Sequence, residues 1–155
     1  VQGNAFGGGL GMMAVCDLAI GVEGARFGLT ETKLGLIPAT IGPYVVARMG
    51  EAKARRVFMN AKLFEAQDAQ GLDLLAKVVA PEDLDAAVEA EVAPYLACAP
   101  GAVAQAKALA RALGPQITPE VIEMSVAALV TCWDGAEAGE GIAAFFEKRP
   151  ASWVV

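Results

Sequence analysis

Two short stretches of the sequence contain residue types that can do chemistry, a glycine triplet and a glutamate downstream of it. The triplet is Gly7–Gly9 in "GNAFGGGLGMMAVCD", and the glutamate is Glu31 in "FGLTETKLGLIP". A glycine turn that leads into a helix exposes backbone N–H groups without intrahelical acceptors, and the helix dipole adds positive potential there. Such a turn suits a phosphate or an oxyanion that forms during a reaction. Close packing of the turn against a neighbouring element would explain the glycines equally well.

Glu31 is the candidate acid/base group. Apolar residues surround it in the sequence, and a carboxylate with little water around it is suited to proton transfer. The alternative is a solvated loop glutamate that pairs with Lys33. The last candidate is the tail "EKRP", where Lys148 and Arg149 follow two phenylalanines. These side chains could hold a phosphate or an adenine ring, or they could form a solvated basic helix end.

Composition excludes several classes of function. The 155 residues carry a net charge of −6, and nucleic-acid binding needs a basic face that is not visible here. There is no histidine, which excludes a histidine-based nucleophile pair or histidine-ligated zinc within the chain. The three cysteines are expected to be buried, reduced thiols of a cytoplasmic protein, and no metal site is expected. Charged residues interrupt every apolar stretch before about 18 residues, so no membrane partner is expected.

The helices and strands that would position these residues can be predicted from the spacing of apolar residues and from glycine and proline, which interrupt helices and strands. We expect a strand over residues 1–3, a helix over 9–16 and two short extended segments over 18–29, then an irregular segment over 31–40. Pro43 and Gly50 are typical of the start and the end of a helix, and a second helix follows with one apolar face. A helix, a turn and a strand are expected over 64–81. Helices are then expected over 82–97, 101–113 and 119–133, with a short one after Gly141. The fold class is α/β with a helical rear, whose apolar character favours an oligomer.

These motifs, in this order, resemble those of the enoyl-CoA hydratase/isomerase (crotonase) family. The stretch "VQGNAFGGGLGMMAVCDLAIGVEGARFGLTETKLGLIP" is similar to the family pattern V-x-G-x-A-x-G-G-G, C-D, A-x-F-G, an acid and L-G-L-x-P, and "EGIAAFFEKRP" is similar to its C-terminal ending. The resemblance implies the later turns of a crotonase-like ββα spiral over residues 1–80, followed by a helical trimerisation region over 81–155. The earlier part of that fold, absent here, is expected from the same polypeptide.

The resemblance also implies site roles. Gly8 matches one backbone donor of the family's oxyanion hole, whose second donor belongs to the absent region, and Glu31 matches the acid/base glutamate. Gly11 stands where hydratases usually have a second glutamate, and its missing side chain would leave a gap for a substrate carboxylate or a water. The expected substrate-binding residues are Gly7, Gly11, Pro38, Phe146 and Lys148. No cofactor is expected, because CoA is part of the substrate.

The resemblance leaves more than one function open. "GGGLGMMAVCDLAI" with "LGLIPATIGPYVVARMG" is similar to bacterial methylglutaconyl-CoA-hydratase-like enzymes, which favours an enoyl-CoA hydratase acting on a branched or carboxylated acyl-CoA thioester. A single glutamate is instead what a 3,2-enoyl-CoA isomerase needs. A non-catalytic acyl-CoA-binding or assembly subunit is a third alternative. The partners expected are the acyl-CoA substrate and further copies of the chain, as a homotrimer or hexamer.

Overall fold

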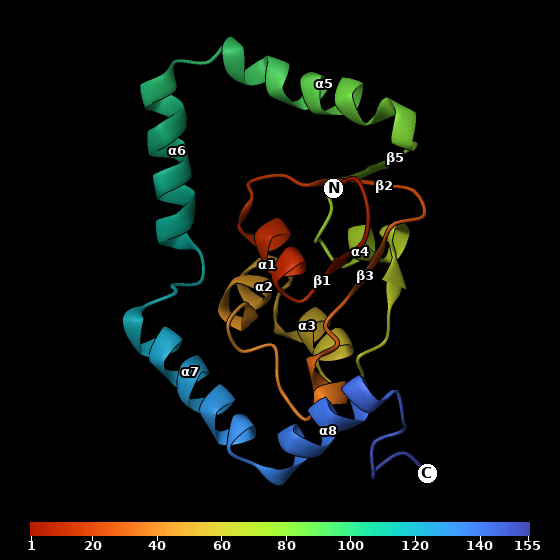
Figure 1. Ribbon diagram of the computed structural model, residues 1–155. Coiled ribbons are helices and arrows are strands. Elements are labelled where there is room, and N and C mark those ends of the chain that lie inside the picture. Colours follow the sequence, from red (N-terminus) through yellow and green to blue (C-terminus); the bar gives the residue numbers. More distant parts are fainter.

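A computed structural model describes all residues, 1–155, and Figure 1 shows their arrangement. The strands all lie within residues 5–79: β1 (Ala5–Phe6), β2 (Ile20–Val22), β3 (Arg26–Gly28), β4 (Phe64–Glu65) and β5 (Lys77–Val79). They form one sheet of order β1-β3-β4 and a second pair of β2 with β5. β1 and β3 are parallel, with Ala5 opposite Phe27 and Phe6 opposite Gly28. The α/β class predicted from the sequence is therefore correct.

Short helices connect and cover these strands. They are α1 (Gly8–Val15), α2 (Gly42–Met49), α3 (Glu51–Phe58) and α4 (Ala66–Gly71), with two 3₁₀ helices, η1 (Glu31–Leu34) and η2 (Pro81–Asp83). The core lies between them and the sheets. Its largest fully buried side chains are Phe27, Leu10, Leu29, Leu74, Leu75 and Val45. Apolar burial of this kind is the main stabilising contribution to the fold.

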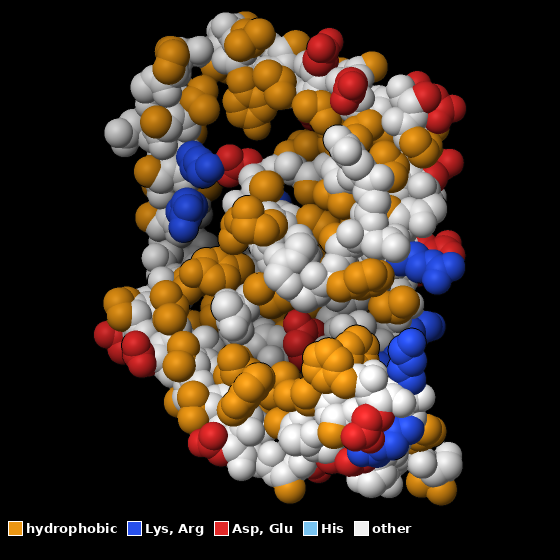
Figure 2. All heavy atoms as spheres, viewed as in Figure 1, with side chains coloured by type: hydrophobic (Ala, Val, Ile, Leu, Met, Phe, Trp, Pro, Cys, Tyr) orange, Lys and Arg blue, Asp and Glu red, His pale blue; other side chains and the backbone are white.

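The second half of the chain is helical: α5 (Leu84–Leu96), α6 (Pro100–Leu113), α7 (Pro119–Trp133) and α8 (Ala136–Glu147). In Figure 1 these helices run around the outside of the strand-containing part of the chain. The last of them, α8, lies against η1. Neither α6 nor α7 buries a residue in this chain. Open space remains between the α5–α6 arm and the rest of the molecule (Figure 2). No helix has both the length and the apolar character needed to cross a membrane.

The structure corrects five local expectations. The first strand forms at residues 5–6 and not at 1–3, although Val1 still runs beside β2 through its N-terminal bond to Ile20 O (2.7 Å). The segment expected to be irregular contains the 3₁₀ helix η1, and strand β4 was not expected. Helix α8 was expected to begin after Gly141, but it begins at Ala136. The cysteines are not buried in this chain: Cys16 and Cys98 are exposed and Cys132 is half-buried. The boundary expected between residues 80 and 81 stays a prediction.

Candidate active site

Parallel pairing of β1 and β3 brings the glycine triplet to Glu31. The ends of parallel strands meet at the same edge of a sheet, and here the pairing continues past β1, because Gly7 N–H donates to Gly28 O at 3.2 Å. The glycines follow β1 at this edge, and Glu31 follows β3 at the same edge. A Cβ added to Gly7 would lie 3.2 Å from Glu31 Oε1. Residues 24 positions apart in the sequence thus form one site.

The glycine turn presents backbone donors to open space. Gly7 has a positive φ of 48°, which turns the chain from β1 into α1. The first bond of the helix is Gly11 N–H to Gly7 O, and Gly8 N–H donates to no backbone or side-chain acceptor. A Cβ at Gly8 would meet nothing within 4 Å. Gly8 is also exposed, and an unpaired, exposed N–H at a helix N-terminus can hold an anionic oxygen.

Glu31 is held at this site without a polar partner. The residue is half-buried, and its Oε2 atom is fully buried and accepts no hydrogen bond. Lys33, two residues later, is exposed and forms no ion pair with it. The alternative of a solvated glutamate paired with Lys33 is therefore wrong. A buried polar atom without a partner is rare in folded proteins and calls for an explanation such as a bound ligand or a proton-transfer role.

The space beside Gly11 is filled by Ile41, the residue before α2. A Cβ on Gly11 would lie 2.3 Å from Ile41 Cγ2 and 2.8 Å from Ile41 Cβ. The expected gap for a substrate carboxylate or a water at this position is therefore wrong. Gly11 is buried, and its lack of a side chain allows α1 and α2 to pack closely. The sequence offered no signal for Ile41, which stands 30 residues away. Pro38, expected to contact substrate, is also buried.

The tail residues lie at the end of α8. Phe146 is 76% exposed and packs edge-on against Phe145, with ring centroids 5.6 Å apart. Lys148 is exposed and has a positive φ of 54°. Their role as a cover for CoA stays a prediction.

Arg149, by contrast, is already engaged within the chain. Its Nη1 and Nη2 donate to the two carboxylate oxygens of Glu140 at 2.7 and 2.9 Å, and its Nε donates to Glu147 at 2.6 Å. The two bonds from Arg149 to Glu140 and the Ser152 N–H lower the pKa of Glu140 to about 2. Of the two basic residues suggested by the tail, only Lys148 is free for an anionic ligand.

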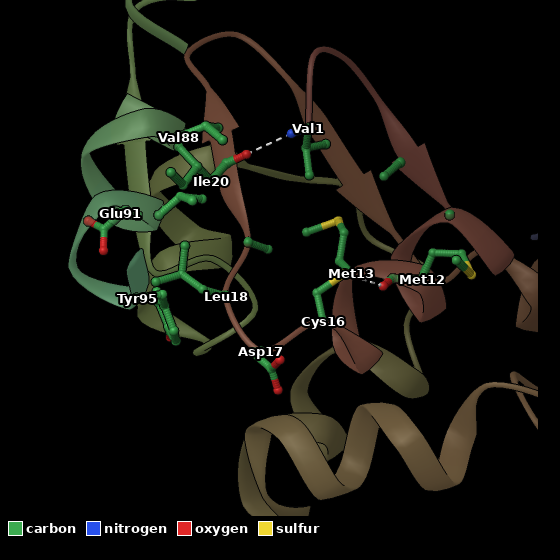
Figure 3. Close-up of a pocket in the computed structure, with 14 residues that line it drawn as sticks. Val1, Met12, Met13, Cys16, Asp17, Leu18, Ile20, Val88, Glu91 and Tyr95 are labelled. Carbon is green, nitrogen blue, oxygen red and sulfur yellow. Dashed lines mark hydrogen bonds between the residues drawn. The ribbon is translucent and has the colours of Figure 1, made fainter. Parts of the chain in front are cut away.

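A cavity of about 620 Å³ lies elsewhere, between α1, β2 and α5. Figure 3 shows its apolar walls, with Met12 and Met13 of α1 on one side and Val88 and Tyr95 of α5 on the other. Of the candidate site residues, only Gly9 of the triplet lines this cavity, and Gly7, Gly8 and Glu31 do not. The cavity thus borders α1 next to the glycine turn, but Glu31 does not face it.

The model of the enoyl-CoA hydratase/isomerase family matches residues 1–154. The chain belongs to this family. It is 33% identical to an enoyl-CoA hydratase of Alternaria alternata over 94% of this chain and 49% of that protein. Among solved structures it is similar to an enoyl-CoA hydratase of Shewanella pealeana (40% identity, TM-score 0.70, 99% of this chain, 57% of that chain). It is also similar to carnitinyl-CoA hydratase of Mycobacterium avium (29% identity, TM-score 0.86, 99% and 60%).

These matches identify the fold. The α/β architecture of this member is the crotonase-like one expected from the motifs, since it superimposes on structures of that family along nearly the whole chain. The chain spans about half to three-fifths of the length of the relatives that it matches.

Proposed function

We propose that this chain carries the acid/base half of an acyl-CoA active site, and that the whole protein is an enoyl-CoA hydratase. The observation that carries the proposal is the partnerless carboxylate of Glu31 beside the glycine turn. Family membership and the names of the similar hydratases support acyl-CoA as the substrate class. A branched or carboxylated acyl group is proposed from the motif resemblance alone.

The proposed reaction adds water across the Cα=Cβ bond of the enoyl thioester. The water oxygen bonds to Cβ while the Glu31 carboxylate takes one proton from the water, and the electron pair of the double bond moves through Cα to the thioester oxygen as an enolate. Gly8 N–H and the N-terminus of α1 stabilise that oxyanion. Protonated Glu31 then delivers a proton to Cα, which completes the net addition of one water and returns Glu31 to its carboxylate form. The second donor to the oxyanion is expected from outside this chain.

A 3,2-enoyl-CoA isomerase is the second candidate, and one observation favours it. Ile41 occupies the space beside Gly11, so that position offers neither a carboxylate nor a water. One carboxylate suffices to move a proton between two carbons of an enolate.

The test uses the full-length protein with 2-enoyl and 3-enoyl thioesters in ¹⁸O-labelled water, followed by mass spectrometry. Hydratase activity incorporates ¹⁸O at Cβ, whereas an isomerase converts the 3-enoyl thioester into the 2-enoyl one without incorporation. Straight, branched and carboxylated acyl groups are compared in parallel. Binding of the thioesters without any turnover would instead indicate a non-catalytic acyl-CoA-binding subunit.

The same assay tests the acid/base role of Glu31. Glu31→Gln keeps the size of the side chain and removes its acid/base function, so turnover is expected to fall by about 10²- to 10⁴-fold while thioester binding is largely kept. Glu23→Gln is the matched control, because Glu23 is exposed in the turn between β2 and β3. Turnover of Glu31→Gln close to that of the wild type would overturn the role of Glu31.

A further inference from the structure

Helix α8 touches the turn that carries Glu31 through backbone atoms. Gly35, with φ +68°, ends η1, and a Cβ at this position would lie 2.4 Å from the carbonyl carbon and oxygen of Glu137 in α8. From the other side, a Cβ on Gly141 would lie 2.5 Å from the carbonyl carbon of Leu34. Backbone atoms cannot rotate out of the way as a side chain can. Only glycine at both positions allows this approach.

The buried residues of α8 are small. They are Ala138, Gly141 and Ala144, spaced three residues apart on one face of the helix. In Figure 1, α8 crosses over the segment that contains η1. Beyond the end of α8, Arg149 binds the Glu140 carboxylate with two bonds, and Ser152 N–H donates to the same carboxylate at 2.8 Å. Packing therefore holds α8 against η1, and the ion pair of Glu140 with Arg149 holds the C-terminal tail on α8.

The carboxylate of Glu31 has no such ion pair. No hydrogen bond or ion pair holds its carboxylate, so its position depends on the backbone of η1. Within the chain that backbone is held by short-range bonds of the turn, such as Leu36 N–H to Glu31 O at 3.1 Å, and by its contact with α8. A displacement of α8 would move η1, and with it the carboxylate beside Gly7.

We infer that α8 positions Glu31, and that Gly35 and Gly141 are the positioning residues that make this possible. The inference rests on the proposed acid/base role of Glu31. Neither glycine touches the reacting atoms; each acts through the distance that it allows between α8 and η1. Misplacing a reacting group by about 1 Å can cost about 100-fold in rate, so small shifts of this contact should be visible in turnover.

The test compares Gly141→Ala with Gly139→Ala in the full-length protein. Both substitutions add one methyl group to α8, but a Cβ at Gly139 meets nothing within 4 Å. We expect kcat per folded molecule to fall about 10- to 100-fold in Gly141→Ala, with KM within a factor of about 2, and to stay unchanged in Gly139→Ala. Hydrogen exchange of the amides over residues 31–36 should be faster in Gly141→Ala only. A folded Gly141→Ala protein with wild-type kcat overturns the inference.

A second variant covers the case in which Gly141→Ala does not fold. Ala138→Gly adds no bulk and loosens α8 at a position that is buried beside Gly35. We expect a smaller fall in kcat in the same direction, and in that case an unchanged kcat would overturn the inference. A merely structural role would lower thermal stability and the folded fraction but leave kcat per folded molecule unaltered.

The outcome is separable from the test of Glu31 itself. If Glu31→Gln is inactive while folded Gly141→Ala turns over normally, the positioning role fails and the proposed function stands. If Glu31→Gln turns over normally, the proposed function fails whatever the α8 variants do.

Discussion

Glu31 and Gly7 lie so close that a single methyl group on Gly7 would stand 3.2 Å from Glu31 Oε1. Such a separation is tighter than most carbon–oxygen contacts, so the carboxylate would have to shift. Parallel pairing of β1 with β3 produces this proximity, and the positive φ of Gly7 turns the chain from β1 towards Glu31. The relationship makes the glycine a probe of the carboxylate's position.

Gly7→Ala is expected to lower both stability and turnover. The positive φ alone should cost about 1–2 kcal/mol of folding free energy, and the displaced carboxylate should lower kcat in addition. Gly24→Ala is the control, since Gly24 also has a positive φ, of 78°, but a Cβ there meets nothing within 4 Å. Denaturant unfolding and turnover per folded molecule separate the two effects. Equal turnover in both variants would contradict the contact with Glu31.

The contact of Gly11 with Ile41 gives a second prediction, on stability. Gly11→Ala should destabilise the protein by about 1–3 kcal/mol, because its methyl group overlaps the Ile41 side chain between α1 and α2. When Ile41 is also replaced by alanine, the cost of Gly11→Ala should largely disappear, and a double-mutant cycle in urea measures this coupling. Gly101→Ala, in a helix with open space around it, serves as the control and should be neutral or slightly stabilising. An equal cost of Gly11→Ala with and without Ile41 would be the contrary result.

Local signals were sufficient for much of the fold. Pro43 and Gly50 bracket α2 as expected, and the apolar face predicted for α3 is confirmed by the burial of Ala54 and Val57. Capping residues, breakers and helical periodicity act over a few residues, so they can be read from the sequence. Strand β4 has only two residues, which pair with residues of β3 that are 37 and 39 positions away, and no local pattern indicates it.

The candidate site could be predicted only in part. Residue types indicated a glycine turn and a glutamate, and the family motif gave them roles, but spacing alone left both with ordinary structural explanations. Their proximity depends on the register of β1 against β3. The filling of the space beside Gly11 by Ile41, and the approach of Gly141 to Leu34, depend on packing between distant elements. Such contacts follow from the whole fold and have no signature in a short window.

The exposed apolar faces of the helical half lead to a prediction on assembly. Leu109 and Leu113 of α6 are 61% and 79% exposed, and α6 buries no residue in this chain. Apolar surface of this kind usually marks an interface. We expect the full-length protein to have the mass of a trimer or hexamer by light scattering. Leu109→Glu with Leu113→Glu should shift it to a smaller species, whereas Gln105→Glu, which adds charge to the same helix, should not. A monomeric wild-type protein would contradict the prediction.

The tie between Glu140 and Arg149 predicts how stability depends on acid. Hydrogen bonds from Arg149 and from Ser152 N–H lower the pKa of Glu140 from 4.5 to about 2, and the same contact raises the pKa of Arg149. The folded state therefore binds this proton less readily than the unfolded state does. The contribution of Glu140 to stability is complete above about pH 4.5 and is lost as the pH falls towards 2.

The variant Glu140→Gln should remove this part of the acid sensitivity. Thermal unfolding midpoints, recorded between pH 6 and pH 2, should converge for variant and wild type as the pH falls, because a protonated glutamate and a glutamine at this position are both uncharged. Glu123→Gln, an exposed position on α7, is the control and should run parallel to the wild type throughout. Curves for Glu140→Gln that also run parallel to the wild type would show that the tie does not hold in solution. Because this ion pair holds the C-terminal tail over residues 149–152 against α8, its loss at low pH should also reduce hydrogen-exchange protection of the tail before the core opens.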